Sequence, residues 1–497
     1  MLVLLPLLLL IIGAYIAYAA GRMGASRDNK LLAGATASVF TALAFIIALL
    51  IASDVWDSAT GSVEYTIGSG LLRVDALGIF LILVSTFLTL MVSIYSTRYM
   101  RDDSRLEHFF PLLLLMTAGI VGIGMATDLF TIYIFYELMC IASYVLVVFR
   151  KEKWDAVEAG MKYVVLSAAG SAIALFAMAL IYGQFGSFDI DVIMGEAIGG
   201  SMAMATVILL IVGFGVKAAI VPLHTWLPDA HSAAPSGISA MLSGIVIQTG
   251  FIVLLKFILV FEGVTAVWQV LIGLAIVTMT VGNIMAFVQF GSRRPDLKRI
   301  LAYSSIAQMG YIILGVSVGM AYGIEAGIRG GIFHIMTHAF MKGLAFLCAG
   351  AFIMRISTRN VKRMQGIGYA MPFTAFAFVI AALSLSGAPP FSGFMSEWMI
   401  FKAGVDAVVD IGWIGILIAL IVLINSVISL GYYLPIIRTF YLKPKGRLLG
   451  AKRAPTAMLI PIVILATITL ILGIWPELGL QAVEPVVDFF VSLGGGF

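Results

Sequence analysis

Charge is scarce in this 497-residue sequence. Only 11% of the residues are Asp, Glu, Lys or Arg, whereas 61% are hydrophobic. Soluble domains carry roughly 25% charged residues, so this chain has too little charge to cover a surface that faces water. The scarcity of charge excludes an ordinary soluble globular protein.

Several chemical motifs are also missing. The sequence has no nucleotide-binding loop, no CxxC pair and no haem motif, and no connection is long enough to fold by itself. Its two cysteines, Cys140 and Cys348, lie inside apolar runs and are interpreted as packing residues. No basic stripe with aromatic residues indicates nucleic acid as a partner. We therefore expect no cofactor, no metal and no redox centre on this chain.

What the sequence has instead is apolar runs of 18 residues or more, each long enough to cross about 30 Å of hydrocarbon. Because the backbone must satisfy its own hydrogen bonds in lipid, long runs without period-two alternation predict helices. The predicted fold is an all-α membrane protein with about 14 transmembrane helices. Their expected ranges are 2–19, 31–52, 75–97, 109–126, 128–149, 160–182, 202–221, 236–261, 265–289, 298–320, 323–354, 370–403, 411–440 and 454–474.

The connections between these ranges alternate in charge. The basic ones follow helices 1, 3, 5, 9, 11 and 13, and they include Arg22, Arg27, Lys30, Arg98, Arg101, Arg105, Arg150, Lys151, Lys153, Arg293, Arg294, Lys298, Arg299, Arg355, Arg359, Lys362, Arg363, Lys443, Lys445, Arg447, Lys452 and Arg453. The opposite connections include Asp54, Asp57, Glu64, Asp189, Asp191, Glu196, Asp406 and Asp410, with Arg73 as their one basic residue. Basic loops stay on the cytoplasmic side. We expect a multi-pass protein of the cell membrane with both termini outside, and a mitochondrial inner membrane is the less favoured location.

Two ionisable residues lie in the middle of predicted helices, where a charge costs at least about 2.5–3.5 kcal/mol. Glu137 is too far from either end of its helix to reach water. Lys217 lies five residues before Pro222, which predicts a broken helix of the kind that lines ion sites. A carboxylate favours charged lysine and burial favours neutral lysine. We expect Glu137 to set when Lys217 holds its proton, although a structural ion pair remains the alternative.

His334 and His338 are spaced i, i+4, so they share one helix face, which Lys342 continues by another turn. A zinc site would need further ligands, and none is evident. Histidine titrates near neutral pH. We therefore interpret the three residues as a proton relay.

A second broken helix is predicted at Pro389 and Pro390, and it carries the buried Glu397. Four further residues are weaker candidates for the same path, because each has a simpler explanation. Lys256 and Lys402 lie near helix ends and are typical of surface anchors, Lys162 could belong to a loop, and Gln248 carries no charge.

The paired breaks indicate an internal repeat. Helices 4–8 in residues 109–262 and helices 9–13 in residues 263–440 each have the broken helix in fourth place. An odd number of spans per unit gives inverted topology and two half-channels. Residues 1–108 are expected to form three N-terminal helices, and residues 441–497 the last one.

The segment VGFGVKAAIVPLHTWLPDAHSAAPSGISAMLSG closely resembles the signature of the proton-translocating antiporter-like family. DLKRILAYSSIAQMGYIILG and HAFMKGLAFLCAG resemble two further blocks, so that the resemblance covers roughly residues 75–440. The family comprises large membrane subunits of complex I, of energy-converting hydrogenase-type complexes and of Mrp-type Na+/H+ antiporters. The resemblance implies the 14-helix fold with inverted repeats.

The resemblance also implies roles for individual residues. By position, Glu137 matches the family's helix-5 glutamate, Lys162 its helix-6 lysine and Lys217 its helix-7 lysine. His334 and His338 match the helix-11 histidines, and Glu397 matches the ionisable residue of helix 12. Two departures stand out. Gln248 occupies a position that is Lys or His in many members, and the stretch from Gln289 to Arg299 is lengthened. A path between the two halves would then run through water at Gln248 or be altered.

These observations predict a proton-translocating, antiporter-like subunit of a multisubunit respiratory or hydrogenase-type complex, with Na+ exchange as an option. Its expected partners are related antiporter-like subunits, other membrane subunits, a peripheral redox arm and lipid. The complex would be an NADH dehydrogenase-like or hydrogenase-like oxidoreductase, with the redox chemistry on other chains. The alternatives are a subunit of a stand-alone Na+/H+ antiporter, a quinone-binding redox subunit, and a silent scaffold, which only Gln248 favours.

Overall fold

The computed structural model describes residues 2–26, 30–58, 62–67, 70–194, 201–261, 265–443 and 454–494. Six charged loop residues used in the topology prediction lie outside these ranges: Arg27, Glu196, Lys445, Arg447, Lys452 and Arg453.

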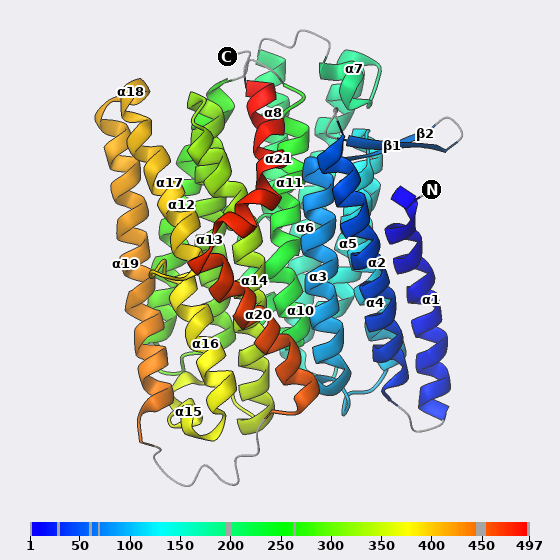
Figure 1. Ribbon diagram of the computed structural model, residues 1–497, viewed down its shortest axis with the longest axis vertical. Helices are drawn as coiled ribbons and strands as arrows, with labels where there is room; N and C mark the ends of the chain where they lie inside the picture. The colour runs from blue at the N-terminus through cyan, green and yellow to red at the C-terminus, as the bar shows by residue number, and fades with distance from the viewer. Residues whose placement is uncertain are drawn as a thin grey trace.

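The described residues form a bundle of helices that run mostly along its long axis (Figure 1). Twelve of these helices are long and apolar enough to cross a membrane. The prediction of an all-α membrane protein is therefore confirmed. The continuous helices are α1 (Leu5–Ser26), α2 (Leu32–Asp57), α3 (Ala76–Tyr99), α4 (Leu106–Met125), α5 (Leu129–Val147), α6 (Trp154–Phe185), α12 (Thr265–Gly291), α13 (Leu297–Tyr322), α14 (Glu325–Ile356), α19 (Trp413–Tyr441) and α20 (Thr456–Ile474).

One further span is built from three consecutive pieces. α10 (Ser236–Met241) continues through a π-helical turn (Leu242–Val246) into α11 (Ile247–Ile258), and the whole span is buried. Widened π turns occur often at functional sites. This one ends two residues before Gln248.

The two predicted spans that are absent from the twelve are the two that the prolines interrupt. α8 (Ser201–Lys217) stops at Lys217, and the chain resumes a helix only at α9 (Trp226–Ala233). α16 (Pro372–Leu385) and α17 (Ser392–Asp406) are separated in the same way around Pro389 and Pro390. Proline has no backbone donor and clashes with the preceding turn, which explains both interruptions. The count of 14 spans, which includes these two, stays a prediction.

Several small elements were missed from the sequence. β1 (Ser62–Ile67) and β2 (Gly70–Asp75) pair as an antiparallel hairpin. α21 (Glu477–Gly494) follows α20, and the two helices run obliquely across the face turned to the viewer in Figure 1. The remaining short pieces are α7 (Ile190–Met194), α15 (Ile367–Ala370), α18 (Val408–Ile411) and the 3-10 turns Leu2–Leu4 and Val361–Met364.

Aspartates cap three of the long helices. Asp75 accepts the Gly78 backbone N–H at 2.6 Å at the start of α3, and Asp128 accepts the Thr131 N–H at 2.8 Å at the start of α5. Asp296 does the same for two N–H groups of α13. The first N–H groups of a helix have no partner within the helix. These caps therefore fix where the three helices begin.

The connections contact one another in two separate groups. Among the predicted basic connections, Arg150 pairs with Asp103 at 2.8 Å, and Asp296 bridges to Asn360. In the opposite group, Asp128 bridges to Asp189, and Arg73 pairs with Asp191 at 2.7 Å. Each of these four contacts joins connections that the charge alternation assigns to the same end.

At the second break α16 and α17 pack closely against each other, and a substitution at Gly393 tests this packing. A Cβ at Gly393 would lie 1.9 Å from the Ser384 carbonyl oxygen. We expect Gly393→Ala to destabilise the protein by about 1–3 kcal/mol, as overpacking does, and to lower the melting temperature of the purified complex. Gly273→Ala is the control, because nothing lies within 4 Å of its Cβ position. Equal melting temperatures for the two variants would contradict the packing argument.

Candidate functional site

Lys217 is fully buried at the end of α8. Its Nζ donates to the Tyr163 hydroxyl at 2.5 Å and to the Ser143 hydroxyl at 3.1 Å. The same atom lies 5.2 Å from the ring centre of Tyr144 and 4.7 Å from that of Tyr163. Hydroxyl oxygens and aromatic faces are what a buried ammonium needs. No described carboxylate lies within ion-pair distance of Lys217.

The break after Lys217 is held by neighbouring groups. The Trp226 indole donates to the Val216 carbonyl at 2.8 Å, and the Thr278 hydroxyl accepts the Val221 N–H at 3.0 Å. The Trp226 ring also stacks on Tyr163, with centroids 4.0 Å apart and planes 5° apart. Backbone groups freed by the break are thus satisfied, and the same tryptophan fixes the tyrosine that contacts Lys217.

Glu137 lies on α5 and accepts a hydrogen bond from Ser171 of α6. It is half-buried, and Ile134 and Ile141, one turn to either side, are exposed. Glu137 makes no ion pair with Lys217 within the described residues. The structure therefore places the two members of the predicted coupling pair in one region without bringing them into contact.

Lys162 lies apart from this cluster. Its side chain is 47% exposed and pairs with Glu158 at 2.7 Å and with Asp229 at 2.9 Å. The next residue along α6, Tyr163, makes the contact with Lys217 instead. A lone tyrosine in an apolar run gives no sequence signal as strong as that of a lysine, which is why it was missed.

The middle of the bundle joins α11 to α14 through Gln248. Its Nε2 atom donates to the Ile335 carbonyl at 3.0 Å and lies 2.6 Å from Nδ1 of His338. Because an amide nitrogen only donates, His338 accepts there as a neutral ring protonated on Nε2. Gln248 Oε1 and His338 Nε2 have no hydrogen-bond partner in the part of the chain that the structure describes.

A second polar cluster follows on the same face of α14. The His334 and His338 rings lie 6.1 Å apart. His334 Nε2 is 2.5 Å from the Gln308 side-chain oxygen, and its Nδ1 is 2.7 Å from the Ser396 hydroxyl. Gln308 of α13 was not predicted, although a glutamine in the middle of an apolar run was a visible signal.

Glu397 is nearly fully buried on α17 and accepts a hydrogen bond from Ser426 at 2.5 Å. Gln308, which contacts His334, also lies beside this carboxyl group. A Cβ at Gly387, which has φ +65°, would lie 2.3 Å from Glu397 Oε2. The left-handed glycine in the break therefore leaves room for the carboxylate.

The three remaining candidate lysines differ in their exposure and in their partners. Lys342 is fully buried and donates to the Leu301 carbonyl at 2.9 Å. Lys256 is 7% exposed, lies 3.9 Å from Asp75 and donates to a backbone carbonyl. Lys402 is 58% exposed and pairs with Asp406 at 3.3 Å. Lys402 thus has the setting of a surface anchor, whereas the other two are inside the bundle.

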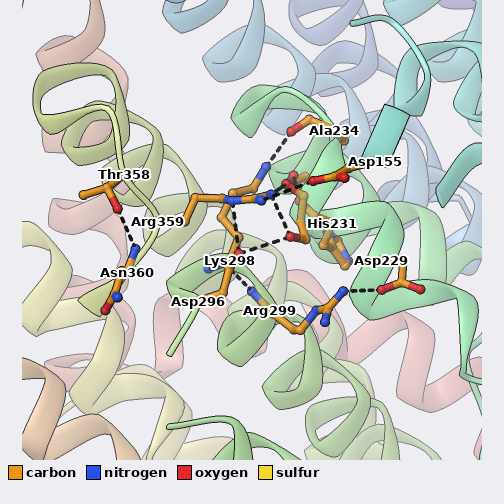
Figure 2. A network of polar contacts seen from close by, with 12 residues as sticks. Asp155, Asp229, His231, Ala234, Asp296, Lys298, Arg299, Thr358, Arg359 and Asn360 are labelled. Atoms are coloured by element: carbon orange, nitrogen blue, oxygen red, sulfur yellow. Dashed lines mark hydrogen bonds and ion pairs between the residues drawn. The ribbon is translucent and has the colours of Figure 1, made fainter. Parts of the chain in front are cut away.

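A network of ion pairs and hydrogen bonds lies where the basic connections meet (Figure 2). Asp229 of α9 pairs with both Lys162 and Arg299. Arg359 pairs with Asp296 at 3.1 Å and donates to the Ser232 carbonyl at 2.6 Å. The charged side chains around the adjoining cavity of about 620 Å³ include Asp155, Glu158, Lys162, Asp229, Asp296, Arg299 and Arg359. The lengthened stretch before α13 therefore has a structural role: Arg299 at its end pairs with Asp229 of α9, the helix that follows the first break.

A smaller ion pair lies at the opposite end. The bidentate contact with Arg73 lowers the pKa of Asp191 below its ordinary value and raises the pKa of Arg73. The single basic residue of the acidic connections is thus paired. It ties β2 to α7.

Comparison with known proteins identifies the family. Residues 126–429 match the family described as "NADH:quinone oxidoreductase/Mrp antiporter, TM", and residues 60–110 match "NADH-Ubiquinone oxidoreductase (complex I), chain 5 N-terminus". The chain belongs to this family of antiporter-like membrane subunits.

Individual relatives agree over nearly the full length. The chain is 32% identical to F(420)H(2) dehydrogenase subunit N of Methanosarcina mazei over 86% of this chain and 87% of the relative. A chain in the structure of the membrane-bound sulfane sulfur reductase, an archaeal respiratory membrane complex, superposes with a TM-score of 0.86 at 26% identity, covering 99% of each chain. A chain of the Mrp complex from Dietzia sp. DQ12-45-1b gives 0.83 at 24% identity, over 97% of this chain and 99% of that one.

The network around α9 generates a prediction at Asp296, which both caps α13 and pairs with Arg359. We expect Asp296→Ala to lower the stability of the purified complex by about 0.5–2 kcal/mol through the lost cap. Asp296→Asn keeps a capping oxygen and should lose less. The measurement is the melting temperature of each variant at low and high salt. If Asn and Ala are equally destabilising, the ion pair rather than the cap holds this connection.

Proposed function

We propose that the chain is a proton-translocating subunit of a multisubunit respiratory or hydrogenase-type membrane complex. The observation that supports this function most directly is the line of buried polar groups inside an otherwise apolar bundle. It begins at Glu137 and Lys217, continues through Gln248 and His338, and ends at Glu397. Burial of unpaired polar groups in lipid is costly, so a function explains their presence better than packing does.

The proposed steps run between groups on neighbouring helices, and the first of them joins two residues that do not contact each other. A protonation change at Glu137 alters the proton affinity of Lys217, which gives its proton toward α11. Gly250 of α11 lies against Lys217, since a Cβ there would be 3.0 Å from the Lys217 Cβ. His338 and His334 pass the proton along α14 to Glu397, and Gln308, which contacts His334 and lies beside Glu397, positions the two groups. Release from Glu397 to one side completes the transfer.

The uncharged Gln248 is compatible with proton transfer, so its presence does not require the chain to be a silent scaffold. Its amide holds His338 in the tautomer that leaves Nε2 carrying a proton, and its own oxygen is left unpartnered among the described residues. Buried polar atoms without partners suit bound water, which can carry a proton where the glutamine side chain cannot.

The same proposal includes the location of the protein, its internal repeats and its partners. The two groups of connecting loops support a cell-membrane location with the basic end toward the cytoplasm and both termini outside. The two interrupted helices support inverted repeats at 109–262 and 263–440, with 1–108 and 441–497 outside them. Related antiporter-like subunits and a peripheral redox arm are the proposed partners.

A stand-alone Na+/H+ antiporter is the second candidate, because the chain superposes closely on a chain of an Mrp complex. The proteins that copurify with the native chain distinguish the two candidates. Iron–sulfur or hydrogenase subunits favour the redox complex, whereas small membrane subunits alone favour the antiporter. A quinone-binding subunit has less support, since no described side chains suggest an electron-carrying centre.

The first test is ion uptake by proteoliposomes that contain the purified native complex, with pH and sodium dyes read separately. We expect Glu137→Gln to assemble and to lose most ion movement, because the amide cannot change its charge. Glu325→Gln is the matched control, since that carboxylate is exposed and pairs with Arg329. If Glu137→Gln moves ions at the wild-type rate, the chain is a scaffold or its channel is silent.

The central step is tested at Gln248. Gln248→Leu removes the hydrogen bond to His338, and we expect uptake to fall about tenfold or more, which is ~1.4 kcal/mol of barrier. Gln248→His supplies a ring that can itself carry a proton and should recover most of the uptake. Full activity in the leucine variant would mean that protons cross between the two halves elsewhere.

A further inference from the structure

Three hydroxyl groups lie one turn apart on a single face of α6. Tyr163, Ser167 and Ser171 are spaced i, i+4 and i+8, and residues with that spacing line up along a helix. All three are buried, with exposed fractions of 0%, 2% and 7%. The face that they share is the one that α6 turns toward the cluster around Lys217.

The two ends of this row contact the two residues that the proposed function couples. At one end the Tyr163 hydroxyl lies 2.5 Å from Lys217 Nζ. At the other end Ser171 donates to the Glu137 carboxylate. Glu137 and Lys217 do not contact each other, and the row on α6 is one polar connection between them; Ser143 of α5 also contacts Lys217.

Ser167, in the middle, differs from most buried hydroxyls of the protein. Thr89, Thr117 and Ser305 each bond a carbonyl four residues earlier in their own helix, at 2.8–2.9 Å. Ser167 makes no such bond, and its hydroxyl has no hydrogen-bond partner among the described residues, although the Tyr144 side chain lies beside it. A buried polar group without a partner costs about 1–3 kcal/mol. A serine hydroxyl donates one hydrogen bond and accepts two, so Ser167 can bind a water in addition to its interaction with Tyr144.

The spacing also suits water. Successive members of the row are separated by about 6 Å of helix rise, and no direct hydrogen bond joins the three hydroxyls among the described residues. One water in each interval would join the three hydroxyls into a continuous chain.

We propose that Tyr163, Ser167 and Ser171 form a proton relay along α6 between Glu137 and Lys217. This inference rests on the proposed function and deepens it. In each transfer an oxygen of the row receives one proton and releases another, so the hydroxyls end unchanged. The net result is a proton lost by the Glu137 carboxyl group and gained by the Lys217 amine, which then gives a proton toward α11.

The test measures proton uptake by proteoliposomes with the native complex carrying Ser167→Ala. We expect uptake to fall about tenfold, equivalent to ~1.4 kcal/mol of barrier. Ser317→Ala is the matched control, because Ser317 is also a fully buried serine without a hydrogen-bond partner among the described residues and lies on α13. Ser167→Thr restores a hydroxyl at the same position and should recover most of the lost uptake.

A second variant tests the end of the row. Tyr163→Phe keeps the aromatic ring that stacks on Trp226 and removes only the hydroxyl beside Lys217. We expect it to assemble normally and to shift the pH at which uptake is half-maximal, which a purely structural loss would not do. An unshifted profile at full rate would contradict a role for this hydroxyl.

The outcomes separate this relay from the function on which it rests. If Glu137→Gln abolishes uptake while Ser167→Ala leaves it at the wild-type rate, the relay is wrong and the proposed function stands. Equal losses in Ser167→Ala and Ser317→Ala would also overturn the relay, since any buried hydroxyl would then serve. If Glu137→Gln has no effect, the proposed function itself fails first.

Discussion

The burial of the Lys217 ammonium without a carboxylate partner among the described residues is the constraint on which the first half of the bundle depends. An ammonium in a low-dielectric interior needs compensating groups, and here hydroxyls and aromatic faces provide them. A tight salt bridge would stabilise one charge state strongly, whereas neutral hydroxyls favour it only moderately. The arrangement stabilises the buried lysine with hydroxyls and aromatic faces in place of a carboxylate.

The broken helices follow from the same constraint. A continuous helix would bond its carbonyls internally, but the break after Lys217 frees groups that Trp226 and Thr278 then satisfy. Trp226 belongs to α9, and α9 is clasped by Asp296, Arg299 and Arg359 from the second half of the chain. The position of the buried lysine therefore depends on ion pairs at the water-facing end. A movement there would reach Lys217 through two rigid aromatic rings.

The sequence predicted the parts whose signal lies along the chain. Apolar run length located most ends of the continuous helices to within about three residues, but α1 and α2 end seven and five residues later and α6 begins six residues earlier than predicted. The prolines located both breaks. It did not predict α21, whose apolar residues are interspersed with Glu484 and Asp488, or the β-hairpin. The site residues Glu137, Lys217, His334, His338 and Glu397 were visible because charge is rare in such runs. Ser143, Tyr163 and Ser426 were missed because hydroxyls are ordinary in membrane helices, and only packing between helices gives them partners. Gln308 was missed although its amide stands out in an apolar run.

Lys162 and Tyr163 illustrate the difference between a prediction made from the sequence and the contacts in the structure. The two residues are adjacent, and a helix turns about 100° per residue, so one points to the ion pairs at the end of the bundle and the other to Lys217. Family resemblance selects the lysine as the helix-6 residue of the path, while the geometry gives the contact to the tyrosine. The two interpretations are compatible if Lys162 holds Asp229, and thereby α9 and Trp226, in register with Tyr163. In that case Lys162 acts on the proton path by positioning rather than by carrying the proton, and its charge matters through Asp229 alone.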